Sequence, residues 1–242
     1  MTPLVTGRDL AIAGRLEPSA LDLAAGELVC LVGPNGSGKS SLLAALAGIP
    51  PARGEVRIGG QQPAGMHPHQ RQRLLSFLPP SREVHWPLKA ADLIALSLPP
   101  GSEWDGLIHE LELETLLERR VDELSTGERT RVLIARALAP QAKLVLLDEP
   151  IANLDPYWQL LVLERLRQAA RVDGRAVVVA IHDLRLAQQW GDRLIVMQHG
   201  RIVADGPPAE IERSAILSQV FGVAWTGAEW RISPLADRRS SP

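Results

Sequence analysis

The sequence has 242 residues, of which 45% are hydrophobic and 22% are charged, and its formal net charge is −2. This composition is typical of a globular protein, and the near-neutral charge excludes a broad electrostatic attraction to nucleic acid. Because Cys30 is the single cysteine, a disulfide framework and a cysteine-based zinc site within one chain are excluded.

The first predicted strand, residues 28–32, runs into the glycine-rich stretch GPNGSGKS at residues 33–40, and the helical pattern KSSLLAALAG follows. Strand, loop and helix together predict a phosphate-binding loop, whose glycines let backbone N–H groups surround a phosphate. We expect Lys39 to contact the β- and γ-phosphates of a nucleotide and Ser40 to bind Mg²⁺. The predicted nucleotide-binding residues are Gly33, Pro34, Asn35, Gly36, Ser37, Gly38, Lys39, Ser40 and Ser41.

Residues 89–139 form a predicted helical region, since apolar residues recur at helical spacing in ADLIALSL and LIHELELETLLERR. Proline pairs at 79–80 and 99–100 mark its start. Within it, the stretch LSTGERTR has a polar turn before a helical run, and Ser125 and Glu128 have the spacing of a capping box. Such a glycine-containing helix start is also a candidate anion site, the second in this chain.

Two further predicted strands lead into residues that could take part in catalysis. The strand at 144–147 leads into Asp148, which we expect to hold Mg²⁺ through water, and into Glu149. A second carboxylate there is unfavourable unless a cation or a reacting water requires it, so Glu149 is the predicted general base. The strand at 176–181 leads into His182 at the same sheet edge, where it would hold the γ-phosphate and the attacking water. No role is assigned to His67, His69, His85, His109 and His199.

Apolar runs at 56–58 and 193–197 complete five candidate strands, and helical patterns follow most of them. This alternation predicts an α/β fold with a largely parallel sheet. The stretch HGRIVADG at 199–206 indicates a turn and a short edge strand. We predict one domain, 1–242, with an α/β core formed by residues 1–88 and 140–242 and a helical subdomain at about 89–139.

The order of these motifs resembles that of the ATP-binding cassette (ABC) ATPases over nearly the whole chain. The phosphate loop at 33–40 is followed by a signature at 124–128, the acidic strand at 144–149, the segment 152–155 and His182. The resemblance implies a RecA-like P-loop NTPase core with antiparallel edge strands, which hydrolyses ATP with Mg²⁺ by in-line attack of water. It also implies that the catalytic residues are Lys39, Glu149 and His182 and that the metal-binding residues are Ser40 and Asp148.

The resemblance gives the second anion site a role. In this family two subunits pack head to tail, and each signature closes over the γ-phosphate held by its partner. Carried over to this chain, Asp155 would lie on the loop that crosses the dimer interface, and ATP binding would close the dimer to drive a transport channel. The residues expected to contact ATP in trans are Ser125, Thr126, Gly127 and Glu128.

Three departures from the family pattern matter. Thr126 stands where the family usually has glycine, so we expect weakened or altered closure. Pro80 stands where a glutamine usually reaches Mg²⁺, which leaves Ser81 or a water to fill the position and Mg²⁺ one protein ligand short. No aromatic residue precedes the phosphate loop to stack on adenine. We expect adenine to rest on aliphatic atoms near residues 13–15, and the choice between ATP and GTP stays open.

Importer subunits for cobalamin, haem and ferric siderophores are the most similar ABC proteins, through residues 74–98 and the FGV motif at 221–223. That resemblance implies a second copy of the chain, transmembrane permease subunits and, indirectly, a periplasmic or extracellular binding protein as partners. The loop at 81–98 would receive the permease, with Trp86, Pro87 and Leu88 as candidate anchors. The alternative for Trp86 is that it packs inside the helical region. An exporter ATPase and a catalytically impaired regulatory cassette are the alternatives.

Segment lengths and local composition argue against other classes of ABC protein and against a membrane span. Residues 41–123 are too few for the long coiled coil of chromosome ATPases, and we expect no nucleic-acid partner. Apolar runs such as 177–181 are too short to cross a bilayer, and the N-terminal stretch lacks the features of a signal peptide. We therefore expect a peripheral location on the cytoplasmic side of the inner membrane.

Overall fold

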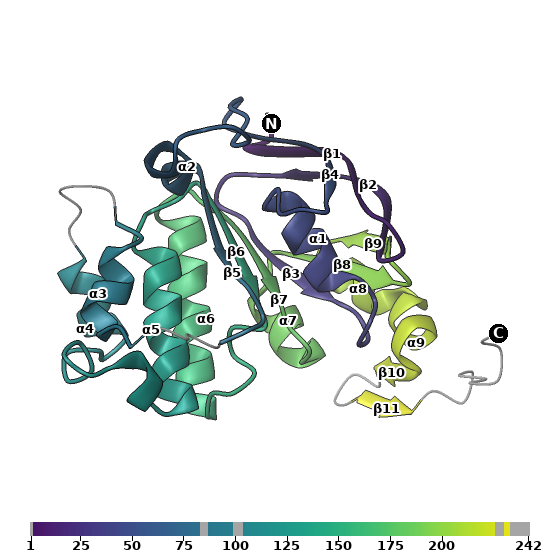
Figure 1. Cartoon of the computed structure of the whole chain (residues 1–242). Helices are drawn as coiled ribbons and strands as arrows, with labels where there is room; N and C mark the ends of the chain where they lie inside the picture. Colours follow the sequence, from purple (N-terminus) through teal and green to yellow (C-terminus); the bar gives the residue numbers. More distant parts are fainter. Residues whose placement is uncertain (1, 83–86, 99–103, 226–229, 233–242) are drawn as a thin grey trace.

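The computed structural model describes residues 2–82, 87–98, 104–225 and 230–232. A six-stranded sheet forms its centre (Figure 1), with the strand order β5 (Leu75–Leu78), β6 (Leu144–Asp148), β7 (Ala176–Ala180), β3 (Leu28–Val32), β8 (Arg193–Gln198) and β9 (Arg201–Gly206). The first five strands are parallel, and β9 pairs antiparallel with β8 at the edge. The predicted α/β fold with a mostly parallel sheet is confirmed.

A smaller antiparallel sheet has the order β2 (Leu16–Leu23), β1 (Val5–Ile12) and β4 (Arg53–Ile58). The strand predicted at 56–58 is part of β4, which pairs with β1 rather than with the parallel sheet. The strands β1 and β2 were not predicted. Their pairing shifts register between Gly7 and Leu10 and again before Ile12, and Asp9 has a φ of 52°. These bulges break the two-residue alternation by which a strand is recognised in a sequence.

Helix α1 (Lys39–Leu46) lies between the two sheets (Figure 1). Its buried leucines, Leu42, Leu43 and Leu46, share a hydrophobic cluster with residues of β1, β2 and β4 and with Val29 and Leu31 of the central sheet. Contact with a sheet on either side therefore explains why α1 is strongly apolar. This packing fixes the start of α1 against the end of β3.

The other face of the central sheet is covered by α5 (Thr126–Leu138), α6 (Pro156–Arg171) and α7 (Leu184–Trp190). The alternate β3 residues Leu28, Cys30 and Val32 pack into this second cluster. Strands buried on both faces are expected to be apolar throughout, and β3 is buried at every position. Burial raises the pKa of the Cys30 thiol to about 12, and Asp192 adds to this effect.

The described part of residues 89–139 contains α3 (Ala90–Ala95), α4 (Asp105–Glu110), a 3-10 turn η1 (Val121–Glu123) and α5, together with one isolated bridge between Lys89 and Arg120. The proposed limits of the helical subdomain stay a prediction, and Pro99, Pro100 and Trp86 lie outside the described residues. The remaining elements are α2 (Pro68–Leu74), α8 (Pro208–Arg213), α9 (Ile216–Phe221), β10 (Val223–Trp225) and β11 (Trp230–Ile232). Among the described residues, no helix combines the length and apolar character that a membrane crossing requires.

Candidate functional site

Three neighbouring strands end at one edge of the central sheet and bring the predicted site residues together. Because β6, β7 and β3 are adjacent and parallel, Asp148, His182 and Gly33 lie at or just beyond their carboxyl ends. The N–H of Glu149 donates to the carbonyl of Ala180 at 3.2 Å, which extends the pairing of β6 and β7 past Asp148. This edge is where α/β folds bind ligands.

The phosphate loop has the backbone that its sequence predicts. Gly36 and Gly38 have φ values of 78° and 103°, in the left-handed region that favours glycine. Lys39 folds back over the loop, and its Nζ donates to the carbonyls of Gly33 at 2.8 Å and Pro34 at 3.2 Å. Burial lowers the pKa of Lys39, and the nearby carboxylates oppose that shift. The loop thus holds the Lys39 ammonium against the carbonyls at its own start.

Two glycines of the loop are required by their close neighbours. A Cβ at Gly33 would lie 2.4 Å from the carbonyl oxygen of Met197 and 2.5 Å from the hydroxyl of Ser37. A Cβ at Gly38 would lie 3.0 Å from the carbonyl oxygen of Arg15. The loop is therefore pressed against β8 on one side and against the turn between β1 and β2 on the other.

Asp148 is fully buried at the end of β6. Among the described residues neither of its carboxylate oxygens has a well-formed hydrogen bond, which is costly for a buried charge. Burial raises the pKa of Asp148, and the nearby Ser40 hydroxyl is the largest opposing influence. A carboxylate beside a hydroxyl is an oxygen donor set that suits Mg²⁺, which often takes only one or two protein ligands beside substrate phosphates. The described residues contain no cluster of three or more His, Cys, Asp or Glu side chains that could hold a metal.

Glu149 and His182 form a direct pair across the ends of β6 and β7. The Nε2 atom of His182 is in hydrogen-bond contact with Oε1 of Glu149. Glu149 adopts a φ of 51°, a left-handed conformation that is strained for a residue with a side chain. The two predicted catalytic side chains are thus adjacent, and their chemical roles stay predictions.

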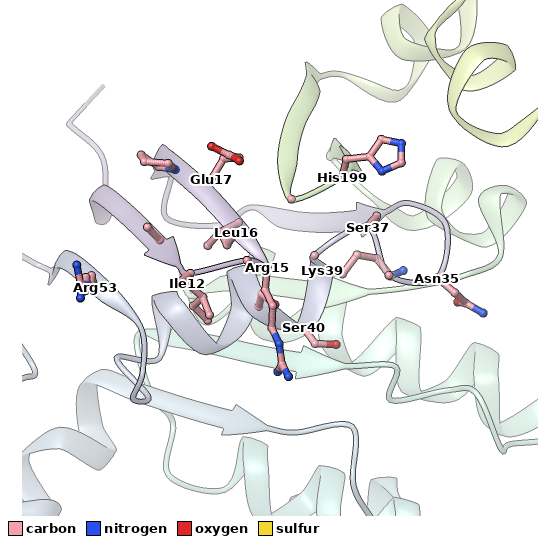
Figure 2. Close-up of a pocket in the computed structure, with 18 of the residues that line it drawn as sticks. Ile12, Arg15, Leu16, Glu17, Asn35, Ser37, Lys39, Ser40, Arg53 and His199 are labelled. Atoms are coloured by element: carbon pink, nitrogen blue, oxygen red, sulfur yellow. The ribbon is translucent and has the colours of Figure 1, made fainter. Parts of the chain in front are cut away.

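A cavity of about 840 Å³ opens beside the phosphate loop (Figure 2). It is lined by residues 11–18, 35–41 and 199–200, together with Arg53 and Glu149. Its size lies within the range of small-molecule sites. Residues 13–15, where adenine was expected, are part of the lining, but Arg53 and His199 were not predicted to take part. Their place depends on how the smaller sheet and the β8–β9 turn pack over the loop, which no local pattern shows.

The predicted capping box at the start of α5 is confirmed. The N–H of Glu128 donates to Oγ of Ser125 at 3.3 Å, and the N–H of Ser125 donates to Oε2 of Glu128 at 2.8 Å. The other carboxylate oxygen of Glu128 accepts from Arg119 at 3.0 Å. Thr126 contributes its carbonyl, which accepts from the Thr130 hydroxyl at 2.8 Å. The signature turn is therefore well formed within a single chain.

The signature residues 125–128 are not among the described residues that line the cavity. They lie instead beside the segment that leads into α6. A Cβ at Gly127 would lie 3.8 Å from Leu154 and 4.0 Å from the carbonyl oxygen of Asn153. The next residue, Asp155, caps α6 by accepting from the N–H of Trp158 at 3.2 Å. The start of α5, which is the second candidate anion site, thus lies close to the segment that ends at Asp155.

The turn after β5 contains a residue that the sequence did not single out. Pro80 is exposed there, in place of the glutamine that the family pattern has. The guanidinium of Arg82 reaches the end of β6, where its Nη2 donates to the carbonyls of Asp148 at 2.7 Å and Glu149 at 3.1 Å. Arg82 belongs to no motif, so only the neighbouring position of β5 and β6 shows that it reaches the site.

Comparison with known proteins gives consistent matches. A family profile described as "ABC transporter" matches residues 16–152. The hemin import ATP-binding protein HmuV of Thermobifida fusca is 38% identical over 217 residues, which cover 85% of this chain and 76% of that protein. The protein of that name from Streptomyces coelicolor is 38% identical over 240 residues, with coverage of 90% and 85%.

Solved structures agree with this result. A structure described as the ATP binding subunit of an ABC transporter has a TM-score of 0.76 and 27% identity, and the match covers 87% of this chain and 92% of that one. A dimeric cassette bound to ADP and Pi has a TM-score of 0.73 with coverage of 84% and 98%, and at 24% identity it shows a shared fold. The chain therefore belongs to the ABC transporter family, as one of its ATP-binding cassette ATPases.

Proposed function

We propose that this chain is the ATP-hydrolysing subunit of an importer for haem or a related metal chelate, such as an iron–siderophore or cobalamin. One observation carries the hydrolytic part: Lys39, Asp148 and the Glu149–His182 pair meet at one sheet edge beside the phosphate loop. The importer and haem parts are supported by the relatives named as hemin import proteins at 38% identity.

In the proposed reaction the loop amides and Lys39 bind the phosphates of ATP. Ser40 and Asp148 would hold Mg²⁺, which when bound neutralises charge on the phosphate oxygens. Glu149 accepts a proton from the attacking water, and His182 holds the Glu149 carboxylate in place and orients the water. The contact between His182 and Glu149 supports this division of roles.

The signature supports a head-to-tail dimer, because its turn is well formed but lies away from the cavity of its own chain. In such a dimer the start of α5 faces the γ-phosphate bound by the partner, with Asp155 at the interface. A transmembrane permease, which this chain would contact from the cytoplasmic side of the inner membrane, completes the transporter together with an external binding protein. Its contact loop at 81–98 lies partly outside the described residues.

The hydrolytic part is tested by measuring ATP turnover of the purified chain and of Glu149→Gln. Because a general base contributes about 10²–10⁴-fold, we expect a loss of at least about 100-fold, with ATP binding retained and a dimer stabilised in MgATP. The matched control is Glu118→Gln, an exposed carboxylate that pairs with Lys89. Parental turnover in Glu149→Gln would show that Glu149 is not the base.

The transport part is tested by reconstitution with candidate permease and binding-protein subunits, followed by uptake assays with haem, siderophores and cobalamin. Transport that needs the permease but no binding protein would favour the exporter alternative. The alternative of a catalytically impaired regulatory cassette is supported by Pro80 and Thr126, which depart from the family pattern. ATP binding without turnover, even in the presence of the permease, would favour that alternative.

A further inference from the structure

Arg82 connects two segments that are far apart in the sequence. Its Nη1 donates to the carbonyl of Pro79 in its own turn, while its Nη2 donates to the carbonyls of Asp148 at 2.7 Å and Glu149 at 3.1 Å. The guanidinium is planar with its donors in a fixed fork, so it can bind several carbonyls at once in one orientation. The turn after β5 is thereby joined to the end of β6.

Arg82 makes these bonds at the point where the hydrogen-bonded pairing of β6 with β5 has ended. The pairing of β5 with β6 ends at Leu78 and Leu147. Beyond that point, β6 still pairs with β7, as far as Asp148 opposite Ala180, but no longer with β5. Buried backbone carbonyls require a donor, and Arg82 supplies one on the side that β5 has left.

The chain conformation at this point also needs support. Glu149 has the left-handed φ of 51°, and such strain persists only where the surroundings fix it. Its carbonyl accepts from the N–H of Ala152 at 3.3 Å as well as from Arg82. Its carboxylate contacts His182. Arg82 therefore acts on the backbone of the residue whose side chain meets the histidine.

The charge of Arg82 suits this position. Two consecutive carboxylates, Asp148 and Glu149, repel each other, and a guanidinium beside them offsets part of that repulsion. Burial lowers the pKa of Arg82, but arginine remains protonated in proteins. The turn that lacks the family's glutamine at Pro80 thus delivers a cation two residues later.

We propose that Arg82 is a positioning residue that fixes the backbone of Glu149, so that the Glu149 carboxylate is held beside His182 for its work as general base. The inference rests on the proposed hydrolysis of ATP. The Arg82 donors bind the backbone carbonyls of Pro79, Asp148 and Glu149, so we expect Arg82 to act through Glu149. Its loss is expected to lower kcat and to leave ATP affinity nearly unchanged.

The test compares Arg82→Ala and Arg82→Lys with Arg71→Ala, a control that removes another guanidinium–carbonyl bond, to Ala47 at 2.6 Å. Since a misplacement of about 1 Å can cost about 100-fold in rate, we expect kcat of Arg82→Ala to fall about 10- to 100-fold while the ATP dissociation constant changes less than about threefold. Arg82→Lys keeps the charge but not the fork, so it should recover only part of the rate. Millimolar guanidinium at constant ionic strength should raise the rate of Arg82→Ala and not that of Arg71→Ala.

Hydrogen exchange of peptides covering residues 144–154 supplies a readout that does not depend on turnover. Exchange there should increase in Arg82→Ala and stay at the parental level in Arg71→Ala. A kcat within about twofold of the parent, or unchanged exchange at 144–154, would overturn the inference. If the parent and Arg71→Ala hydrolyse ATP and Glu149→Gln does not, the proposed function stands whatever Arg82→Ala shows. If the parent itself does not hydrolyse ATP, the proposed function and this inference fall together.

Discussion

Replacing Gly33 by alanine tests how tightly the phosphate loop is packed. The new Cβ would lie 2.4 Å from the Met197 carbonyl oxygen and 2.5 Å from the Ser37 hydroxyl, whereas Cβ contacts under 3.0 Å are essentially never seen. The Ser37 side chain can rotate, but the Met197 carbonyl belongs to the buried strand β8 and cannot. The loop backbone must therefore move away from β8 by at least about 0.6 Å.

The size of the effect follows from this displacement. Overpacking of a close-packed site costs about 1–3 kcal/mol, and for a chain of this size each kcal/mol lowers the melting temperature by about 2–4 °C. A displaced loop amide also loses its bond to a phosphate, and a bond to a charged group contributes about 1.5–3 kcal/mol. We therefore expect ATP binding to weaken by about 10- to 100-fold in Gly33→Ala.

Calorimetry or fluorescence titration would measure the ATP dissociation constant, and a thermal melt would measure stability. Gly106→Ala is a matched control, because Gly106 lies in α4 with nothing within 4 Å of an added Cβ. Alanine should stabilise that helix by about 0.5–1 kcal/mol and leave ATP binding unchanged. A Gly33→Ala protein with parental affinity and melting temperature would refute the reasoning about the loop.

Three further predictions concern other parts of the chain. With a pKa of about 12, Cys30 should resist iodoacetamide at pH 8 in the native protein and react after unfolding, as mass spectrometry would show; rapid native labelling would contradict its burial. Ser125→Ala removes the cap of α5 and should cost about 1 kcal/mol, read as a melting temperature about 2–4 °C lower, whereas Ser125→Asp should retain the cap. Pro80→Gln should raise ATP turnover if a missing Mg²⁺ ligand limits the rate, and an unchanged rate and Mg²⁺ dependence would count against that idea.

The parallel strands β3, β6 and β7 were predictable because each is buried at every position and contains a continuous apolar run. The parallel strand β5 was not among the predicted strands, since it is short and its two middle residues are only partly buried. The strands of the smaller sheet were not, since bulges around Asp9 interrupt their alternation. The strand at 56–58 was recognised, but its partner was not, because pairing with β1 is a property of the fold rather than of the local sequence.

The same distinction separates the predicted site residues from those that were missed. Lys39, Asp148 and His182 each end a recognisable strand or loop, so sequence order and sheet topology suffice to place them together. Arg82 and His199 stand in turns without a motif. They reach the site only because β5 neighbours β6 and because the β8–β9 turn packs over the loop.

The cavity lies at a seam between the two sheets. The Arg15 carbonyl of the smaller sheet abuts Gly38 of the phosphate loop and Gly200 of the β8–β9 turn, and the N–H of Glu17 donates to the carbonyl of Gly200 at 2.9 Å. A ligand that fills this seam touches both sheets, so binding is thermodynamically linked to their association. At a ligand concentration 100 times its dissociation constant this linkage adds about 2.7 kcal/mol to folding stability. Resistance to proteolysis should then rise with nucleotide concentration, even in variants that cannot turn the nucleotide over.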